Sequence, residues 1–173
     1  MIGCYPGSFD PPTVAHLAVA EAAVAAAALD RLDLVISRAA LGKEHLDERS
    51  LERRLATLDA VAATRPWLGV AVTDARLIAD IARPYDAVVM GADKWRQVTD
   101  AAWYHDEAER DAALAALPLV LVAPRGDDRP DGVRLLDVDG AHLHVNATAI
   151  RDGAAHADGW VLPEAAHLHR PDA

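Results

Sequence analysis

The sequence predicts a single α/β domain built on a doubly wound parallel sheet with helices on both faces. Three observations support this fold class. The 173 residues fit one domain, and a 52% share of hydrophobic residues is enough for a buried core. Short runs rich in valine, leucine and isoleucine alternate along the chain with helical patterns. Strands of this composition are typical of parallel sheets that are covered on both faces.

Short apolar runs predict the strands. The first run begins at Ile2 and stops at a Pro/Gly turn, as a buried strand does. A run at residues 143–145 predicts a short sixth strand. The longer strands are predicted at residues 2–5, 32–37, 70–73, 85–90 and 118–123.

Helical patterns fill most of the segments between these strands. Thr13 and Ser50 each stand at the start of such a pattern, and their side chains can cap a helix. After Ser50, apolar side chains recur on one face of the predicted helix. The predicted helices cover residues 14–29, residues 50–64, a short segment ending at Ile81, and residues 107–117.

Right-handed crossovers between parallel strands make this alternation a doubly wound, Rossmann-like sheet. Ligands of such sheets bind outside the carboxyl ends of the strands, near the point where the strand order switches. We therefore expect the binding region at the turns after the first and fourth strands. Residues 1–153 form the predicted domain, residues 124–132 a polar surface loop within it, and residues 154–173 a partly ordered C-terminal tail.

Charge and composition disfavour several classes of partner. The net charge of −10 argues against a nucleic-acid partner, because binding to phosphates needs basic residues. No apolar run has the ~20 residues of a membrane-spanning helix, and no signal peptide is recognisable, so we expect no membrane contact. The single cysteine, Cys4, fits a reducing cytoplasm. The sequence leaves a homo-oligomer open.

The turn after the first strand carries Gly7, Ser8, Phe9, Thr13 and His16. It has neither the Gly-Lys-Ser/Thr of a P-loop nor the Gly-x-Gly-x-x-Gly of a dinucleotide site. Glycine lets the backbone approach a ligand closely, and a helix N-terminus binds phosphate through its free N–H groups. His16, three residues after Thr13, can donate to the same anion. The alternative is a surface histidine beside an ordinary turn.

The string Tyr-Pro-Gly-Ser-Phe-Asp-Pro-Pro-Thr-Val-Ala-His at residues 5–16 resembles the signature of the adenylyltransferase/cytidylyltransferase superfamily of nucleotidyltransferases. That signature is Gly-x-Phe-Asp-Pro, followed by His or Thr, any residue, Gly and His. Thr13 and His16 match its later positions, whereas Ala15 stands where the family has glycine. The resemblance implies an ATP site that includes Gly7, Ser8, Phe9 and His16.

A second segment, Val-Asn-Ala-Thr-Ala-Ile-Arg at residues 145–151, resembles the superfamily motif Ile-Ser-Ser-Thr-x-Ile-Arg. Asn146 and Ala147 replace the two serines, although asparagine can still cap a helix. Thr148 and Arg151 lie three residues apart on the predicted helix, and they offer a hydroxyl and a cation to the β- and γ-phosphates of ATP. The alternative is a capped surface helix with an exposed arginine.

Other segments resemble the pyridine mononucleotide adenylyltransferases of this superfamily. Gly91 and Asp93 follow the fourth strand, where the resemblance implies contact with the adenosine ribose, although Asp93 can also cap the next helix. Trp103 stands where an aromatic residue stacks on the nicotinate ring, Trp95 is the competing candidate, and core packing is the alternative for both. Lys43 precedes a predicted helix that begins with Leu-Glu-x-Arg, an arrangement found in this family. The resemblance implies that Lys43 binds a substrate phosphate, and the alternative is a solvated loop lysine.

The resemblance implies an adenylyltransferase that joins the AMP moiety of ATP to nicotinate or nicotinamide mononucleotide and releases pyrophosphate. The phosphate of this small-molecule substrate attacks the α-phosphorus of ATP in line. His16, Arg151 and a Mg²⁺ ion then stabilise the leaving pyrophosphate, and Thr13 completes the expected catalytic set. No general base is needed, because the attacking phosphate is already ionised at neutral pH.

Two other functions stay open at this point. Residues 5–7 and Thr13 favour pantetheine-phosphate adenylyltransferase, whose sequence begins similarly. The departures at Ala15, Asn146 and Ala147 are compatible with a nucleotide-binding or sensing module that no longer catalyses. We expect no protein-bound metal, because the His-x-His pairs at residues 142–144 and 167–169 lack a convincing third ligand.

Overall fold

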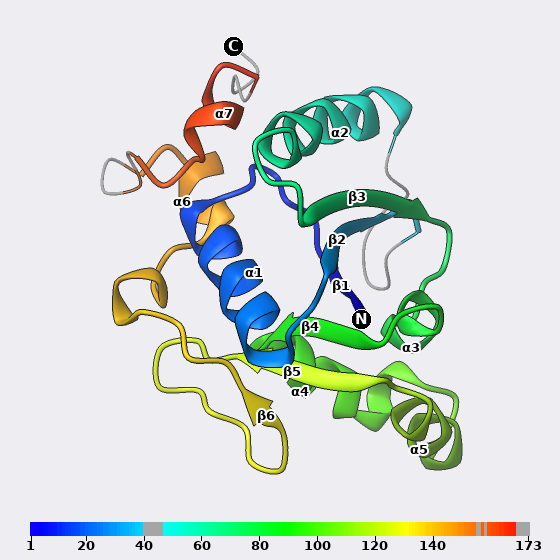
Figure 1. Ribbon diagram of the computed structural model, residues 1–173. Helices are drawn as coiled ribbons and strands as arrows, with labels where there is room; N and C mark the ends of the chain where they lie inside the picture. The colour runs from blue at the N-terminus through cyan, green and yellow to red at the C-terminus, as the bar shows by residue number, and fades with distance from the viewer. Residues whose placement is uncertain (40–46, 155–156, 158, 169–173) are drawn as a thin grey trace.

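The computed structural model describes residues 1–39, 47–154, 157 and 159–168. These residues form a sheet of six strands in the order β3-β2-β1-β4-β5-β6, and all neighbouring strands run parallel (Figure 1). The strand order reverses between β1 and β4, so the sheet is doubly wound. The strands are β1 (Ile2–Pro6), β2 (Arg31–Ser37), β3 (Leu68–Thr73), β4 (Ala87–Gly91), β5 (Leu119–Ala123) and β6 (Arg134–Leu135).

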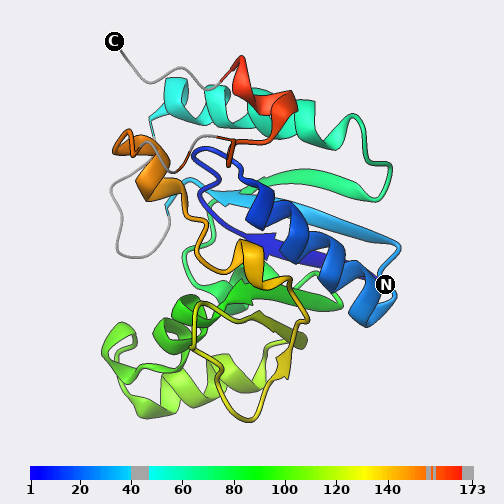
Figure 2. The same cartoon turned by 90° about the vertical axis from the view of Figure 1, so that its left-hand side faces the viewer.

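Helices cover both faces of this sheet, as the sequence predicts. They are α1 (Val14–Ala27), α2 (Glu48–Ala62), α3 (Ile78–Ala82), α4 (Ala92–Thr99), α5 (Glu107–Ala115), α6 (Ala147–Arg151) and α7 (Pro163–Ala166), with 3₁₀ turns η1 (Ala101–Trp103) and η2 (Gly140–His142). α1, α2 and α7 pack on one face of the sheet, and α3, α4 and α5 pack on the other (Figures 1 and 2). None of the helices described is long and apolar enough to cross a membrane.

Alternation along the strands divides the core into two layers. In β2, Leu34 and Ile36 belong to the layer of α1 and α2, whereas Val35 between them belongs to the layer of α3 and α4. All three residues are at most 3% exposed. The strand is apolar at consecutive positions because both of its faces are buried. On α1, the small side chains of Ala20 and Ala23 are fully covered, so this helix lies close to the sheet.

The sixth strand is the main element that the sequence-based prediction places wrongly. Residues 143–145 form no strand, because they only link η2 to α6. The Asp139 carboxylate accepts from the N–H of Ala141 at 2.8 Å and starts η2, and the Asn146 side chain accepts from the N–H of Ala149 at 2.8 Å and starts α6. The sixth strand is instead β6, a two-residue strand that pairs with β5 at the edge of the sheet.

The start of α2 also differs from the prediction. Its cap is Asp47 rather than Ser50, so the helix begins two residues earlier, at Glu48. The Asp47 carboxylate accepts from the backbone N–H of Ser50 at 3.0 Å and from its hydroxyl at 2.7 Å. A carboxylate at this position also interacts favourably with the partial positive charge of the helix N-terminus.

The C-terminal segment that precedes α7 pairs with the residues that lead into α1. The N–H of Val14 donates to the carbonyl of Trp160 at 2.9 Å, and the N–H of Leu162 donates to the carbonyl of Pro12 at 3.3 Å. Leu162 is 3% exposed and belongs to the core layer of α1 and α2. α7 then lies beside α2, as both views show (Figures 1 and 2), and this segment fixes the start of α1 from outside the sheet.

Leu162→Ala is expected to lower the free energy of unfolding by about 2–5 kcal/mol, because it leaves a cavity in the core. Leu135→Ala is the matched control on the exposed edge strand, and it should change stability by no more than about 0.5 kcal/mol. Urea unfolding followed by circular dichroism measures both variants. Equally small losses would show that the C-terminal segment contributes nothing to the stability of the core.

Candidate functional site

Two pockets meet at the carboxyl ends of the central strands, where the strand order switches. The first, which we call the α1 pocket, has a volume of about 280 Å³ and lies between the start of α1, the turns after β4 and β5, and α6. The second, the α4 pocket, has a volume of about 550 Å³ and is lined by residues of α2, α3 and α4 and by Trp103 and Tyr104. Ser8, Asp10 and Arg151 line both pockets and form a shared junction.

Basic side chains gather around these pockets in an otherwise acidic chain. The net charge is −10, yet the α4 pocket is lined by Arg54, Arg76 and Lys94. Arg125 lines the α1 pocket, and Arg151 lines both. The local field in such a cleft favours an anionic ligand even though the whole protein is negatively charged.

The turn after β1 is shaped by the ring of Phe9. Phe9 has a φ of 46°, in the left-handed region, and is 1% exposed. Its ring packs edge-on against Tyr5 at 5.4 Å and His16 at 5.1 Å between ring centroids. A Cβ on Gly7 would lie 2.7 Å from this ring. Gly7 is therefore needed here to make room for Phe9, and Phe9 in turn supports the imidazole of His16.

Thr13 and His16 form a reciprocal cap at the start of α1. The N–H of Thr13 donates to Nδ1 of His16 at 3.0 Å, and the N–H of His16 donates to the Thr13 hydroxyl at 3.3 Å. The hydroxyl also lies 2.9 Å from Nδ1. Thr13 is 1% exposed, and its hydrogen bonds with His16 hold the imidazole in place.

These contacts determine the protonation state of His16. Because Nδ1 accepts the N–H of Thr13, the neutral ring carries its proton on Nε2. Burial, with a smaller contribution from Arg125, lowers the pKa of His16 to about 4. At neutral pH the ring is therefore uncharged, and it lines the α1 pocket as a hydrogen-bond donor at Nε2.

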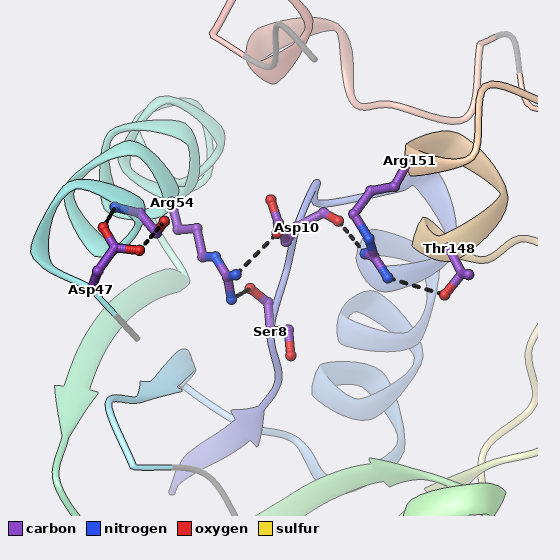
Figure 3. Close-up of polar contacts among 7 residues, drawn as sticks. Ser8, Asp10, Asp47, Arg54, Thr148 and Arg151 are labelled. Carbon is purple, nitrogen blue, oxygen red and sulfur yellow. Dashed lines mark hydrogen bonds and ion pairs between the residues drawn. The ribbon is translucent and has the colours of Figure 1, made fainter. Parts of the chain in front are cut away.

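The second motif lies across the junction from the first (Figure 3). Nη1 of Arg151 donates to the carbonyl of Asp10 at 2.6 Å, and Nη2 donates to the Thr148 hydroxyl at 3.1 Å. Asn146 caps α6 in place of the family's serine, through its bond to the N–H of Ala149. Arg151 thus joins two segments that are 141 residues apart in the chain.

Arg54, a residue not singled out by the sequence analysis, also reaches the junction from α2 (Figure 3). Its guanidinium lies 3.0 Å from the Asp10 carboxylate and donates to the Ser8 carbonyl at 3.3 Å. Its Nε is buried and has no hydrogen-bond partner among the described residues. Desolvation lowers the pKa of Arg54, and the Asp10 carboxylate opposes that shift. The Leu-Glu-x-Arg pattern that ends at this residue is the signal that could have identified it.

The turns after β4 and β5 complete the α1 pocket. Gly91, at the cap position of α4, makes room for the Asp93 carboxylate, because a Cβ on Gly91 would lie 2.7 Å from Asp93 Oδ1. Asp93 is in the first turn of α4, and its other oxygen lies 3.7 Å from Arg125 Nη1. Arg125 belongs to the polar loop at residues 124–132, and nothing in the sequence distinguishes it from the solvated residues beside it.

The two candidate tryptophans occupy different surroundings. Trp103 is 39% exposed and lines the α4 pocket beside Tyr104, whose hydroxyl donates to the carbonyl of Val98 at 2.9 Å. Trp95 packs against the core layer of α3 and α4 and does not line either pocket. Of these two tryptophans, Trp103 alone lines a pocket. Lys43 lies outside the described residues.

The three departures from the family motifs all line the α1 pocket, since Ala15, Asn146 and Ala147 border it. The histidine pair at residues 142–144 is split: His142 borders the same pocket, while His144 packs edge-on against Trp160 at 5.4 Å between ring centroids. Of the second pair, His169 lies outside the described residues. Within the described ranges, no group of three His, Cys, Asp or Glu could hold a metal ion.

Comparisons with known proteins agree with this fold. The sequence matches the cytidylyltransferase-like family over residues 4–151. A search of curated proteins finds no match. Among solved structures, the chain is similar to the nicotinic acid mononucleotide adenylyltransferase of Plasmodium falciparum complexed with APC, with a TM-score of 0.68, 12% identity, and coverage of 96% of this chain and 92% of that one. The same enzyme complexed with NaAD gives a TM-score of 0.67, 13% identity, and coverage of 96% and 93%. At these identities the likeness concerns the fold, and it confirms the predicted α/β sheet.

Gly7→Ala is expected to lower the free energy of unfolding by about 1–3 kcal/mol, because the added methyl overlaps the Phe9 ring. Gly140→Ala is the matched control, since a Cβ there meets no atom within 4 Å. It should be neutral or stabilise by up to about 1 kcal/mol. Chemical unfolding of both variants measures the difference. A Gly7→Ala protein as stable as the wild type would contradict the steric role of Gly7.

Proposed function

The chain belongs to the cytidylyltransferase-like family and is a nucleotidyltransferase, and we propose that it joins the AMP moiety of ATP to nicotinate or nicotinamide mononucleotide, with release of pyrophosphate. The observation that supports this reaction is the pair of pockets with a shared junction at Ser8, Asp10 and Arg151. A transfer between two substrates needs two sites that meet where the bond is made.

ATP is assigned to the α1 pocket. The start of α1 directs the partial positive charge of a helix N-terminus toward this pocket, and His16 adds the Nε2 donor. Arg151, Arg125 and the Thr148 hydroxyl can contact the phosphates from the opposite side. The Asp93 carboxylate, 65% exposed at the same pocket, is an acceptor suited to ribose hydroxyls. With these assignments, His16 of the first motif and Thr148 and Arg151 of the second would all contact ATP.

The acceptor is assigned to the α4 pocket, which is lined by basic side chains and by Trp103 and has a volume of about 550 Å³. Its phosphate would lie at the junction, near Arg54 and Arg151, and its ring would stack on Trp103. An oxygen of that phosphate forms a bond to the α-phosphorus of ATP while the bond to the bridging oxygen of pyrophosphate breaks. The oxygen is already ionised at neutral pH, so the protein has to position the reactants and stabilise charge rather than remove a proton.

Mg²⁺ belongs to this proposal as the ion that ATP carries on its phosphates. Mg²⁺ usually keeps several waters and binds substrate phosphates with one or two carboxylates. The lining of the α1 pocket includes two carboxylates, Asp10 and Asp93, which are too few for a dedicated protein cage.

Two alternatives have specific support. Residues 5–7 and Thr13 resemble the start of pantetheine-phosphate adenylyltransferases, whose acceptor also carries a phosphate. A sensing module without catalysis is supported by Ala15, because its methyl group borders the α1 pocket where the family has glycine. The first alternative differs from the main proposal in its acceptor. The second differs in that no reaction takes place.

The reaction is tested by incubating the protein with ATP, Mg²⁺ and each of three acceptors, and by measuring pyrophosphate release. We expect release with a pyridine mononucleotide and none above background with pantetheine phosphate. Release with pantetheine phosphate alone would favour the other branch. Thermal stabilisation by ATP without release from any acceptor would favour the sensing module.

His16→Ala is expected to lower kcat by about 10²–10³, because it removes one preorganised donor to the leaving pyrophosphate. The exposed His105, in the turn before α5, provides the control His105→Ala, which should leave kcat near the wild-type value. Melting temperatures verify that both variants are folded. Near-normal turnover by a folded His16→Ala protein would rule out this role for His16.

A further inference from the structure

Lys94 is a half-buried cation of the α4 pocket whose bonding partner is neutral. Its Nζ donates to Oε1 of Gln97 at 2.5 Å, and Gln97 lines the same pocket. No carboxylate of the described chain forms an ion pair with it. Asp93, its neighbour in the sequence, lies 3.7 Å from Arg125 instead. Lys94 thus brings to the pocket wall a positive charge that has no ion-pair partner among the described residues and is balanced only in part by the charge of Asp93.

Three other half-buried cations of the described chain are paired with carboxylates. These ion pairs are Arg54 with Asp10 at 3.0 Å, Arg65 with Glu164 at 2.8 Å, and Arg110 with Asp111 at 2.8 Å. Removing a charge from water is costly unless an opposite charge is close by. Burial accordingly lowers the pKa of Lys94. An anionic group of a ligand would supply the missing partner.

The neighbours of Lys94 in the pocket specify what kind of anion this is. The exposed indole of Trp103 and the ring of Tyr104 line the same pocket. The Tyr104 hydroxyl donates to the carbonyl of Val98, the residue after the Gln97 to which Lys94 donates. An aromatic group is therefore suited to this part of the pocket. The acceptor phosphate has to reach the junction, which is formed by Ser8, Asp10 and Arg151 and does not include Lys94. Lys94 is therefore available for a second anionic group, carried on the aromatic end of the acceptor.

We propose that Lys94 determines acceptor specificity by binding a carboxylate on the aromatic ring, so that the protein selects nicotinate over nicotinamide mononucleotide. This inference rests on the proposed function. The pyridinium ring of both acceptors is positively charged and can lie against the Trp103 face. Only the nicotinate ring also carries a carboxylate that pairs with the ammonium group. The nicotinamide ring has a neutral amide and brings an uncompensated positive charge next to Lys94.

Calorimetric titration with each mononucleotide, in the presence of a non-hydrolysable ATP analogue, tests this assignment. We expect the wild type to bind the nicotinate form roughly 10- to 100-fold more tightly, which is the worth of one charged hydrogen bond. Lys94→Met should reduce this ratio to about one by the loss of that bond, and Lys94→Arg should keep part of it because the charge remains. Arg76→Met removes another cation of the same pocket and should keep the wild-type ratio.

The outcomes separate this inference from the proposed function. Equal affinities in the wild type, no binding of either mononucleotide, or an unchanged ratio in a folded Lys94→Met protein would overturn the role of Lys94. An equal fall of the ratio in Arg76→Met would assign the preference to the general field of the pocket, and would overturn it too. If the binding preference depends on Lys94 but neither acceptor releases pyrophosphate from ATP, the proposed reaction is wrong and the specificity assignment stands.

Discussion

The site depends on the two contacts of Asp10 at the junction of the pockets (Figure 3). Its carboxylate pairs with Arg54 of α2 at 3.0 Å, and its carbonyl accepts from Arg151 of α6 at 2.6 Å. Asp10, in the turn after β1, therefore contacts α2 through Arg54 and α6 through Arg151. Arg54 is only 18% exposed, and its charge would be left uncompensated without this carboxylate. The ion pair thus stabilises the same wall that the two pockets share.

A second chain of contacts fixes the orientation of His16. Gly7 makes room for the Phe9 ring, the Phe9 ring supports the imidazole, and Thr13 determines which nitrogen carries the proton. The C-terminal segment completes this support by pairing with the backbone on either side of Thr13. A donor that is held in one tautomer and one orientation needs little reorganisation when a phosphate binds. Residues from both ends of the chain therefore preorganise a single hydrogen-bond donor.

The central strands were predictable because the sheet buries both of their faces. β4 is an apolar run throughout, and β2 is apolar from Leu34 to Ile36. Short apolar runs that lie between helical patterns are typical of buried strands. The edge strand β6 has no such signal: it is two residues long, and its Leu135 is 37% exposed. Residues 143–145, Leu-His-Val, resembled a strand more closely, but the caps at Asp139 and Asn146 commit their neighbours to helical turns. Side-chain hydrogen bonds to the backbone outweighed hydrophobicity there.

By itself, the sequence determined the fold class, the family and the two motif segments that carry His16 and Arg151. Those features are local, since a motif keeps its residues together in the chain and a buried strand shows in its composition. Only the tertiary structure placed Arg54 and Arg125 at the pockets and separated Trp103 from Trp95. It also showed that Lys94 has no carboxylate partner among the described residues. Whether a side chain is paired or free depends on residues far away in the sequence, and a charge count such as −10 sums over the whole chain without locating its charges.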